Sequence, residues 1–543
     1  MSTGVTPDLE QPSRSFRPSR RALVKGAAWA APAAAAVSVG APAFAVSATC
    51  AAKNLLENAQ ARGILLSGHL LNLDLATVAE LKSAHAQTNT TTPWDVDQAG
   101  IAVGALGNFL NIDLTGTGIL VSDILTGLTN VDAGALNQFG YADSDSADDN
   151  SASGGFNGTN SGELGASGTI NDATGAVNFS EGDTGAPSVG NINLKTILEQ
   201  IAGGPAADLV SQVAELNLDI GALFGRAFMD YECSTNNEDV FVLERDYLIA
   251  YLKLILKSDV LGGVLTTLTD GLDSTINIDL NALKDALKSV PILGPLITNL
   301  VNISGSATVD VNTGQLDDQP IPDDPNAALQ LDLAGTTITL NLESLLDGGI
   351  NGQGPNTRLF VDAPLVDGSI TNLVDGIVDS ILDRITHIAS VNIDITLKTL
   401  VLEVARIKVT GSLADLLDGT AQATITVAGA VQVDAALVTK ALGGVIYDTL
   451  AALFNGSGVL AGVVSSLNGL LGSLFSVLTE VLVIYVNAQN APVGGVGPVP
   501  SAYSGLPEGR YDVAALHLAV LDVLDLLDLS LARGSVGENT PQA

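Results

Sequence analysis

The sequence is poor in aromatic residues, histidine, cysteine and basic residues. Of its 543 residues only 4% are aromatic, and it contains 4 His, 2 Cys and 2 Trp. Its 23 Lys and Arg residues stand against 59 Asp and Glu, which gives a formal net charge of −36. Nucleic acid is therefore excluded as a partner, because the chain has no basic stripe to neutralise phosphates, and an anionic membrane surface is disfavoured.

The motifs of common catalytic sites are missing as well. The sequence has no HExxH or CxxC spacing, no GxSxG, no GxGxxG after a strand and no GxxxxGK[ST]. We therefore predict no transition-metal site, no serine hydrolase and no nucleotide cofactor. Paired carboxylates could serve a glycosidase, although a chain this rich in acidic residues offers such pairs by chance.

The first 45 residues resemble a bacterial export signal. Ser19–Lys25 (SRRALVK) contains the twin arginines Arg20 and Arg21, and an Ala-rich apolar run follows. Small residues precede a predicted cleavage site after Ala45. This order is typical of signal peptides, and the twin arginines favour the Tat route over the Sec route. The mature chain would then be extracellular or at the cell surface.

Both cysteines lie after this signal. Cys50 and Cys233 would meet an oxidising environment outside the cell, so we predict one disulfide between them, with two unpaired thiols as the alternative. A disulfide that closes so long a loop would stabilise the fold by roughly 4–5 kcal/mol in the chain-entropy model.

The mature chain has the composition of a large folded α+β protein. The full sequence is 46% apolar and only 15% charged, so it has enough apolar residues to build a core. An aliphatic-Asn-aliphatic-Asp-aliphatic phrase recurs. Each copy predicts a strand that runs into a helix-like segment. The copies are Leu71–Leu75, Leu110–Leu114, Leu216–Ile220, Ile276–Leu280 and Val391–Ile395.

Two longer segments have the 3.6-residue period of amphipathic helices. The first begins at Ile370 and places Asp375, Asp379 and Asp383 opposite its apolar face. The second, 459–481, is long enough to span a bilayer, but its Ser and Asn residues and its lack of basic flanks favour a helix buried against a sheet. We therefore predict no transmembrane anchor in the mature chain.

Loops and strands suggest the domain organisation. The segment 143–168 is rich in Gly, Ser and Asp and predicts an exposed loop or a thin, irregular β region. Prolines near 320 suggest a boundary between an N-terminal α+β region, 46–318, and a C-terminal α+β region, 319–543. Alternating residues predict that 481–536 forms a C-terminal antiparallel β unit.

Calcium is the one metal for which the sequence offers candidate ligands. The segment 143–168 contains an acidic cluster, and oxygen ligands in flexible loops are what Ca²⁺ binds. The candidate ligands are Asp143, Asp145, Asp148 and Asp149. The twelfth position counted from the first of them is Gly154, where an EF-hand has Glu, so a solvated acidic loop is the simpler interpretation.

Several phrases resemble the choice-of-anchor G family of actinobacterial surface proteins. The sequence stretches are Ile484–Gln489 (IYVNAQ), Tyr511–Leu518 (YDVAALHL), Leu529–Gly537 (LSLARGSVG), Ala61–Gly68 (ARGILLSG) and Tyr141–Asp143 (YAD) followed by Ser151–Gly154 (SASG). The resemblance implies an exported cell-envelope protein and supplies no catalytic residues. Leu506–Gly509 (LPEG) lacks the threonine of a sortase signal, so we expect release or non-covalent retention at the wall.

These observations predict an exported, acidic, non-catalytic protein with a structural or adhesive role at the cell surface. Two alternatives stay open: a secreted hydrolase that uses paired carboxylates, and a calcium-binding component of the cell wall. The sequence predicts no other cofactor, and the ligand at the surface is not identified by it.

Overall fold

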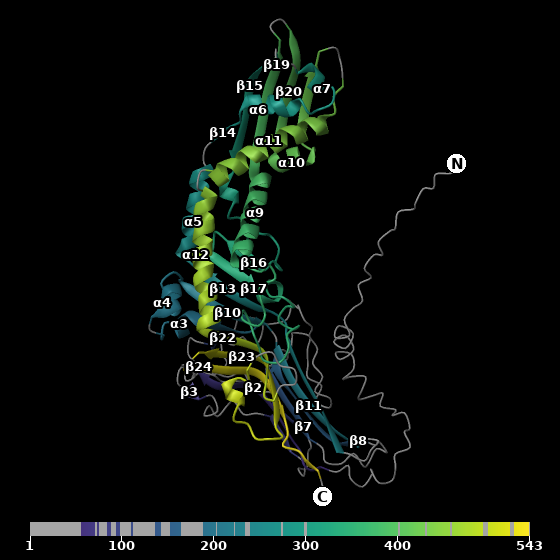
Figure 1. Cartoon of the computed structure of the whole chain (residues 1–543), viewed down its shortest axis with the longest axis vertical. Coiled ribbons are helices and arrows are strands. Elements are labelled where there is room, and N and C mark those ends of the chain that lie inside the picture. The colour runs from purple at the N-terminus through teal and green to yellow at the C-terminus, as the bar shows by residue number, and fades with distance from the viewer. Residues whose placement is uncertain are drawn as a thin grey trace, which may run out of the picture.

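The computed structural model describes residues 56–70, 73–74, 84–87, 94–97, 110–111, 136–142, 153–163 and 188–541, the last with short gaps at 202, 222, 234–238, 273–274, 298–300, 400–401, 429–431, 457–458, 492–497 and 522–525. Helices and antiparallel sheets share this part of the chain, which confirms the predicted α+β class. The molecule is elongated (Figure 1). We call residues 276–311 and 389–442 the head, the two sheets at the opposite end the base, and the elements between them the waist.

The first base sheet joins the two ends of the described chain. Its strand order is β18-β22-β23-β24-β2-β3, and β4 also pairs with β2. The C-terminal strands β22, β23 and β24 confirm the predicted antiparallel unit, and β2 pairs along β24. The bounds are β2 Gln60–Leu70, β3 Leu73–Asp74, β4 Ala84–Gln87, β18 Thr357–Arg358, β22 Leu482–Gln489, β23 Tyr511–Val520 and β24 Leu527–Val536. At its edge β1 (Leu56–Asn58) pairs with β25 (Thr540–Pro541).

The second base sheet has the order β12-β11-β8-β7-β5 and packs on the first. Its bounds are β5 Trp94–Asp97, β7 Leu136–Ala142, β8 Ser153–Glu163, β11 Leu223–Cys233 and β12 Asp239–Ile249. The sheets approach closely at Gly225, where a Cβ would lie 1.8 Å from the Ala532 carbonyl oxygen. The strand β8 lies inside the Gly-rich segment 143–168, so that segment is not a loop throughout.

The waist combines a six-stranded sheet with long helices. The strand order is β16-β17-β13-β10-β9-β6. The strands are β6 Leu110–Asn111, β9 Ser188–Asn193, β10 Glu215–Gly221, β13 Leu252–Lys257, β16 Leu329–Asp332 and β17 Thr337–Asn341, and the helices are α3 Leu194–Leu198, α4 Gly204–Val210, α5 Asp259–Leu272, α8 Leu342–Leu345, α9 Ile370–Ile388 and α12 Val459–Glu480. Strands from both sides of position 318 share this sheet, as they share the first base sheet.

The head is a five-stranded antiparallel sheet with helices on one face. Its order is β14-β15-β19-β20-β21. The bounds are β14 Ile276–Asn277, β15 Asn302–Val311, β19 Ala389–Lys398, β20 Glu403–Ser412, β21 Gln422–Val427, α6 Leu280–Leu287, α7 Leu293–Leu296, α10 Leu413–Asp418 and α11 Ala435–Gly456. Figure 1 places this sheet at the end of the molecule opposite the C-terminus. One continuous apolar core runs from the head through the waist into the base.

The two predicted helices form where the periodicity indicated. Along α9 the residues Leu373, Ile377 and Ile381 are buried, and the predicted outward residues Asp375, Asp379 and Asp383 are exposed. The helix α12 packs against α4, α5, α9 and β22. By length and apolar composition alone, α11 and α12 could each cross a membrane.

Short polar residues start the helices that follow strands. Asn193, Asp279 and Asn341 each cap a helix through a side-chain oxygen that accepts a backbone N–H, at 3.1, 2.9 and 3.2 Å. Each lies at the end of a strand or just after it and is followed by a leucine. The copy Ile276–Leu280 therefore leads from a strand into a helix, whereas the copies Leu216–Ile220 and Val391–Ile395 lie within β10 and β19 and start no helix.

Candidate functional site

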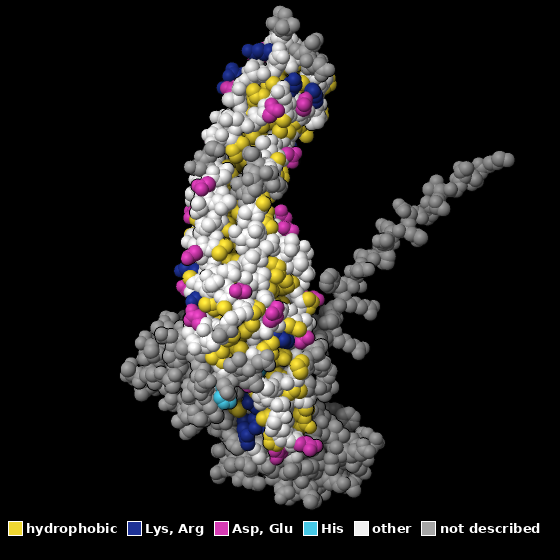
Figure 2. Space-filling model, turned by 60° about the vertical axis from the view of Figure 1, so that its left-hand side comes forward, with side chains coloured by type: hydrophobic (Ala, Val, Ile, Leu, Met, Phe, Trp, Pro, Cys, Tyr) yellow, Lys and Arg dark blue, Asp and Glu magenta, His cyan; other side chains and the backbone are white. Residues whose placement is uncertain are grey.

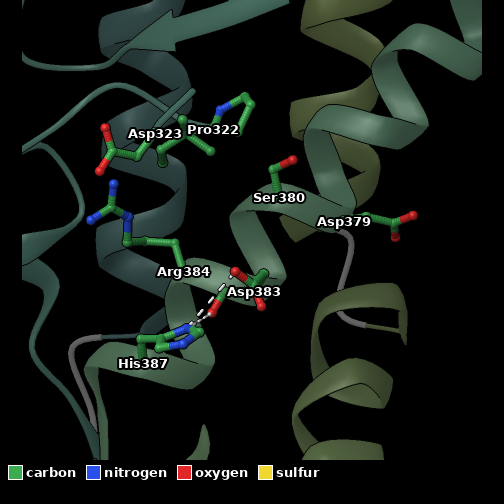
Figure 3. Close-up of a pocket in the computed structure, with 8 residues that line it drawn as sticks. Pro322, Asp323, Asp379, Ser380, Asp383, Arg384 and His387 are labelled. Carbon is green, nitrogen blue, oxygen red and sulfur yellow. Dashed lines mark hydrogen bonds and ion pairs between the residues drawn. The ribbon is translucent and has the colours of Figure 1, made fainter. Parts of the chain in front are cut away.

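A hollow of about 530 Å³ lies beside α9 in the waist (Figure 3). The loop after β15 and the polar side of α9 form it. The lining residues are Ile321, Pro322, Asp323, Asp379, Ser380, Asp383, Arg384 and His387. The apolar stripe of α9 faces the core, so this outer face collects the polar residues of the helix. The loop is held by Gln330, whose amide donates to the carbonyl oxygens of Pro322 and Asp324 at 3.2 and 2.6 Å.

The charged groups of the hollow interact weakly with one another. The Nδ1 atom of His387 lies 2.9 Å from the carbonyl oxygen of Asp383 and 3.8 Å from its carboxylate. The guanidinium of Arg384 donates to Gln319 Oε1 at 3.5 Å and to the Pro320 carbonyl at 3.3 Å. In Figure 3 it points toward Asp323, whereas Asp379 points away from the other side chains.

This arrangement suits weak polar contacts better than acid–base catalysis. A glycosidase needs two carboxyl groups that face each other across the substrate, one of them protonated in an apolar setting. Here Asp379 and Asp383 stand one helical turn apart and point in different directions (Figure 3). The side chains of Asp383 and His387 are 75% and 61% exposed, so water screens their charges.

A second group of polar residues is buried in the base, beneath the loop 498–510. Asp512 is fully buried and accepts hydrogen bonds from Arg510 Nε at 2.9 Å, from Arg533 Nε at 2.5 Å and from Ser535 Oγ at 2.8 Å. Arg533 lies 4.7 Å from the ring centre of Tyr503, in the covering loop. Burial alone would raise the pKa of Asp512, but Arg533 and Arg510 outweigh it and hold that pKa below its ordinary value. Removing one partner of a buried pair of this kind costs about 3–5 kcal/mol.

Ser530, His517 and Asp528 stand beside this cluster and have the residue types of a catalytic triad. Ser530 Oγ lies 2.9 Å from His517 Nδ1 and accepts a hydrogen bond from Tyr503 Oη at 3.0 Å. His517 Nε2 lies 3.6 Å from Asp528 Oδ1. Ser530 and His517 are each 1% exposed, and burial, with a smaller effect of the Arg533 charge, lowers the pKa of His517 to about 3. A general base works best with a pKa near the operating pH, so this group closes the loop onto the sheet and is not arranged for nucleophilic attack.

A shift in strand alternation brings these residues to one face. The pairing of β22, β23 and β24 skips Asn487, Ala515 and Ala532, and backbone φ is positive at Asn487 and Ala532. No residue is inserted, because the register is the same on both sides of this level. The side chains nevertheless exchange faces there: Ser530 and Arg533, three residues apart, both contact Tyr503. Asp512 and His517, five residues apart on β23, therefore both face the covering loop.

Most of the site residues predicted from the sequence lie outside the described residues. These are Arg20, Arg21, the cleavage position Ala45, Cys50, Asp143, Asp145, Asp148 and Asp149. Cys233 ends β11, and its disulfide with Cys50 stays a prediction. Among the described residues, no group of three or more His, Cys, Asp or Glu is placed to hold a metal ion.

Sequence reasoning missed the buried cluster. Its visible signal is that Asp512 and His517 interrupt the apolar and small residues of β23, as Asp528 and Arg533 interrupt those of β24. The signal does not show that Asp512 and Arg533 meet, because this depends on the pairing of β23 with β24.

The comparisons with known proteins concern the whole chain. A family model described as Domain of unknown function (DUF8394) matches residues 61–537, from β2 to the residue after β24. Neither the curated proteins nor the solved structures include a significant match.

Proposed function

We propose that this chain, which belongs to the DUF8394 family, is an exported structural or adhesive protein that presents its head away from the cell surface. One observation carries the proposal. The pairs β1–β25 and β2–β24 bring the two ends of the described chain together at the base, and the head lies at the far end (Figure 1). The twin-arginine segment that contains Arg20 and Arg21 supports export.

The packing of the molecule suits a rigid spacer. The apolar core is continuous from Ile393 in the head, through Ile377 in the waist, to Leu529 in the base. The helices α9 and α12 run along the long axis between these levels (Figure 1). A closely packed interior resists deformation, so it fixes the distance between the head and the base.

The net charge of the chain supports a folded body that lies in water rather than in a membrane. Without residues 1–45 it would carry 57 acidic and 18 basic residues. Such a surplus keeps neighbouring copies apart and soluble. We propose that α11 and α12 belong to the folded body and are not membrane anchors, because α12 buries Leu467, Leu471 and Leu474 among its neighbours.

The competing proposal is a secreted hydrolase. The hollow beside α9 supplies carboxylates for it, although Asp379 and Asp383 do not face each other. Turnover of a polysaccharide that is abolished by Asp383→Asn would support the hydrolase and replace the structural proposal. A calcium-binding wall component is a further alternative; its candidate ligands, Asp143 to Asp149, lie outside the described residues.

Cell fractionation tests export. We expect the wild-type protein in the washed wall or the medium, and the Arg20→Lys/Arg21→Lys variant in the cytoplasm, because the twin arginines are read by the Tat machinery. Blots of cytoplasm, membrane, wall and medium measure this, with Arg14→Lys/Arg17→Lys as the matched control that should export normally. Wild-type protein found in the cytoplasm alone would rule out the surface role.

A further inference from the structure

The open face of the head sheet carries a regular array of polar side chains. Register pairs the strands in three ranks of four residues: Ser304–Thr396–Arg406–Thr426, Ser306–Asp394–Lys408–Thr424 and Thr308–Asn392–Thr410–Gln422. All twelve residues are exposed or half-buried, and none is apolar. The alternate residues of the same strands, such as Ile393 and Ile407, are buried. The helices α6, α10 and α11 pack against the sheet, so this alternation leaves the array facing water.

The centre of the array carries more positive than negative charge. The carboxylate of Asp394 lies 3.2 Å from Arg406 Nη2 and 3.1 Å from Lys408 Nζ. Hydrogen bonds from Arg406 and then Lys408 lower the pKa of Asp394, so one carboxylate neutralises one of two cations. At the outer end of the strands Lys398 stands opposite Glu403 in register, and at the inner end Asp310 accepts a hydrogen bond from Thr275 at 2.6 Å.

The head as a whole differs from the rest of the chain in charge. Its two segments contain 6 Lys and Arg and 8 Asp and Glu, although the chain has 23 of the former and 59 of the latter. Figure 2 shows Lys and Arg side chains on the head, while the waist surface carries mostly acidic ones. At physiological salt, charges beyond about 8 Å are screened, so the acidic body does not prevent an anion from approaching the head.

We propose that the open face of the head binds a polysaccharide that carries carboxylate or phosphate groups. Hydroxyl and amide side chains at strand spacing, about 4.8 Å, would donate to and accept from a sugar chain that crosses the strands. Arg406 and Lys408 would attract its acidic groups, because a guanidinium binds carboxylate and phosphate well. The centre of a protein interface is enriched in aromatic residues and methionine, and none of the twelve side chains is of these types. This inference names the ligand class of the proposed surface protein and rests on that function.

Binding of the full chain to immobilised alginate, a carboxylated glycan, tests the proposal, with neutral dextran as the reference. We expect binding to alginate that weakens as salt rises, and about tenfold weaker binding for Arg406→Gln/Lys408→Gln. Asp394→Asn should bind more tightly than the wild type, because it frees both cations. Lys288→Gln is the matched control, since Lys288 is also an exposed, ion-paired cation of the head but lies at the end of α6, outside the array.

Three results of the binding experiment would contradict the proposal. They are equal binding to dextran and alginate, an unchanged affinity of the double variant, and weaker binding of Asp394→Asn. Phosphorylated glycan in place of alginate distinguishes the two acidic groups. Failure here leaves the fractionation result untouched, so the ligand class and the surface location are judged separately.

Discussion

At the scale of single residues, the base sheet is organised by two residues with positive φ, Asn487 and Ala532. They lie at the level where the three strands leave one residue each unpaired and side chains exchange faces. Odd-numbered and even-numbered polar residues of one strand therefore both gather under Tyr503. Sequence alternation alone would have placed Asp512 and His517 on opposite faces. The buried cluster could not be predicted for this reason, although each of its members is visible in the sequence.

The buried His517 should make stability depend on pH. Burial lowers its pKa to about 3, whereas the unfolded chain binds the proton near pH 6.5. Because the unfolded chain binds the proton more readily than the folded one, the free energy of unfolding is highest above pH 6.5. It decreases as the pH falls from 6.5 toward 3. Between pH 7 and pH 5 we expect a loss of about 2 kcal/mol in the free energy of unfolding, measured by urea denaturation.

His517→Gln is the variant that isolates this effect, because its side chain does not titrate. Its stability should change less than that of the wild type over the same pH range. Burial raises the pKa of Asp528, which acts in the opposite direction as pH falls, and Asp512 titrates below the window; both are present in the two proteins. Parallel pH profiles for wild type and variant would contradict the assignment.

At the scale of elements, local patterns predicted much of the structure. The 3.6-residue period located α9 and α12, and alternation located β22, β23 and β24. The strand β8 was harder, because its composition is that of a loop and its neighbours β7 and β11 hold it in place. The pairing of β2 with β24 joins residues more than 450 positions apart, and no local pattern contains that information.

The caps that start helices after strands offer a test at this scale. Asp279→Ala removes the side chain that accepts from Asn281 N at 2.9 Å, and should cost the first turn of α6 about 1 kcal/mol. Hydrogen exchange of the α6 amides should then be about fivefold faster. Asp318→Ala, an exposed acidic residue in a loop, is the control for the lost charge. Unchanged exchange in α6 would show that the cap is energetically unimportant.

At the scale of the whole molecule, the shape could not be predicted from the sequence. Prolines near 320 suggested two successive regions, yet strands from both sides of that point share the waist sheet and the first base sheet. The polar positions of the head face are visible as alternation in β19, β20 and β21. Their assembly into one array required the register of four strands. The arrangement places the two ends of the described chain, at the base, and the polar face of the head at opposite ends of one continuous core.

Epitope accessibility on unbroken cells tests this orientation most directly. One variant carries an epitope between β19 and β20 at the tip of the head, and the other carries it after Pro541 at the base. On cells that retain the protein, we expect antibody to label the head epitope fully and the base epitope weakly, with both labelled equally after extraction. Labelling of the base but not the head, or of neither before the cells are opened, would contradict the account.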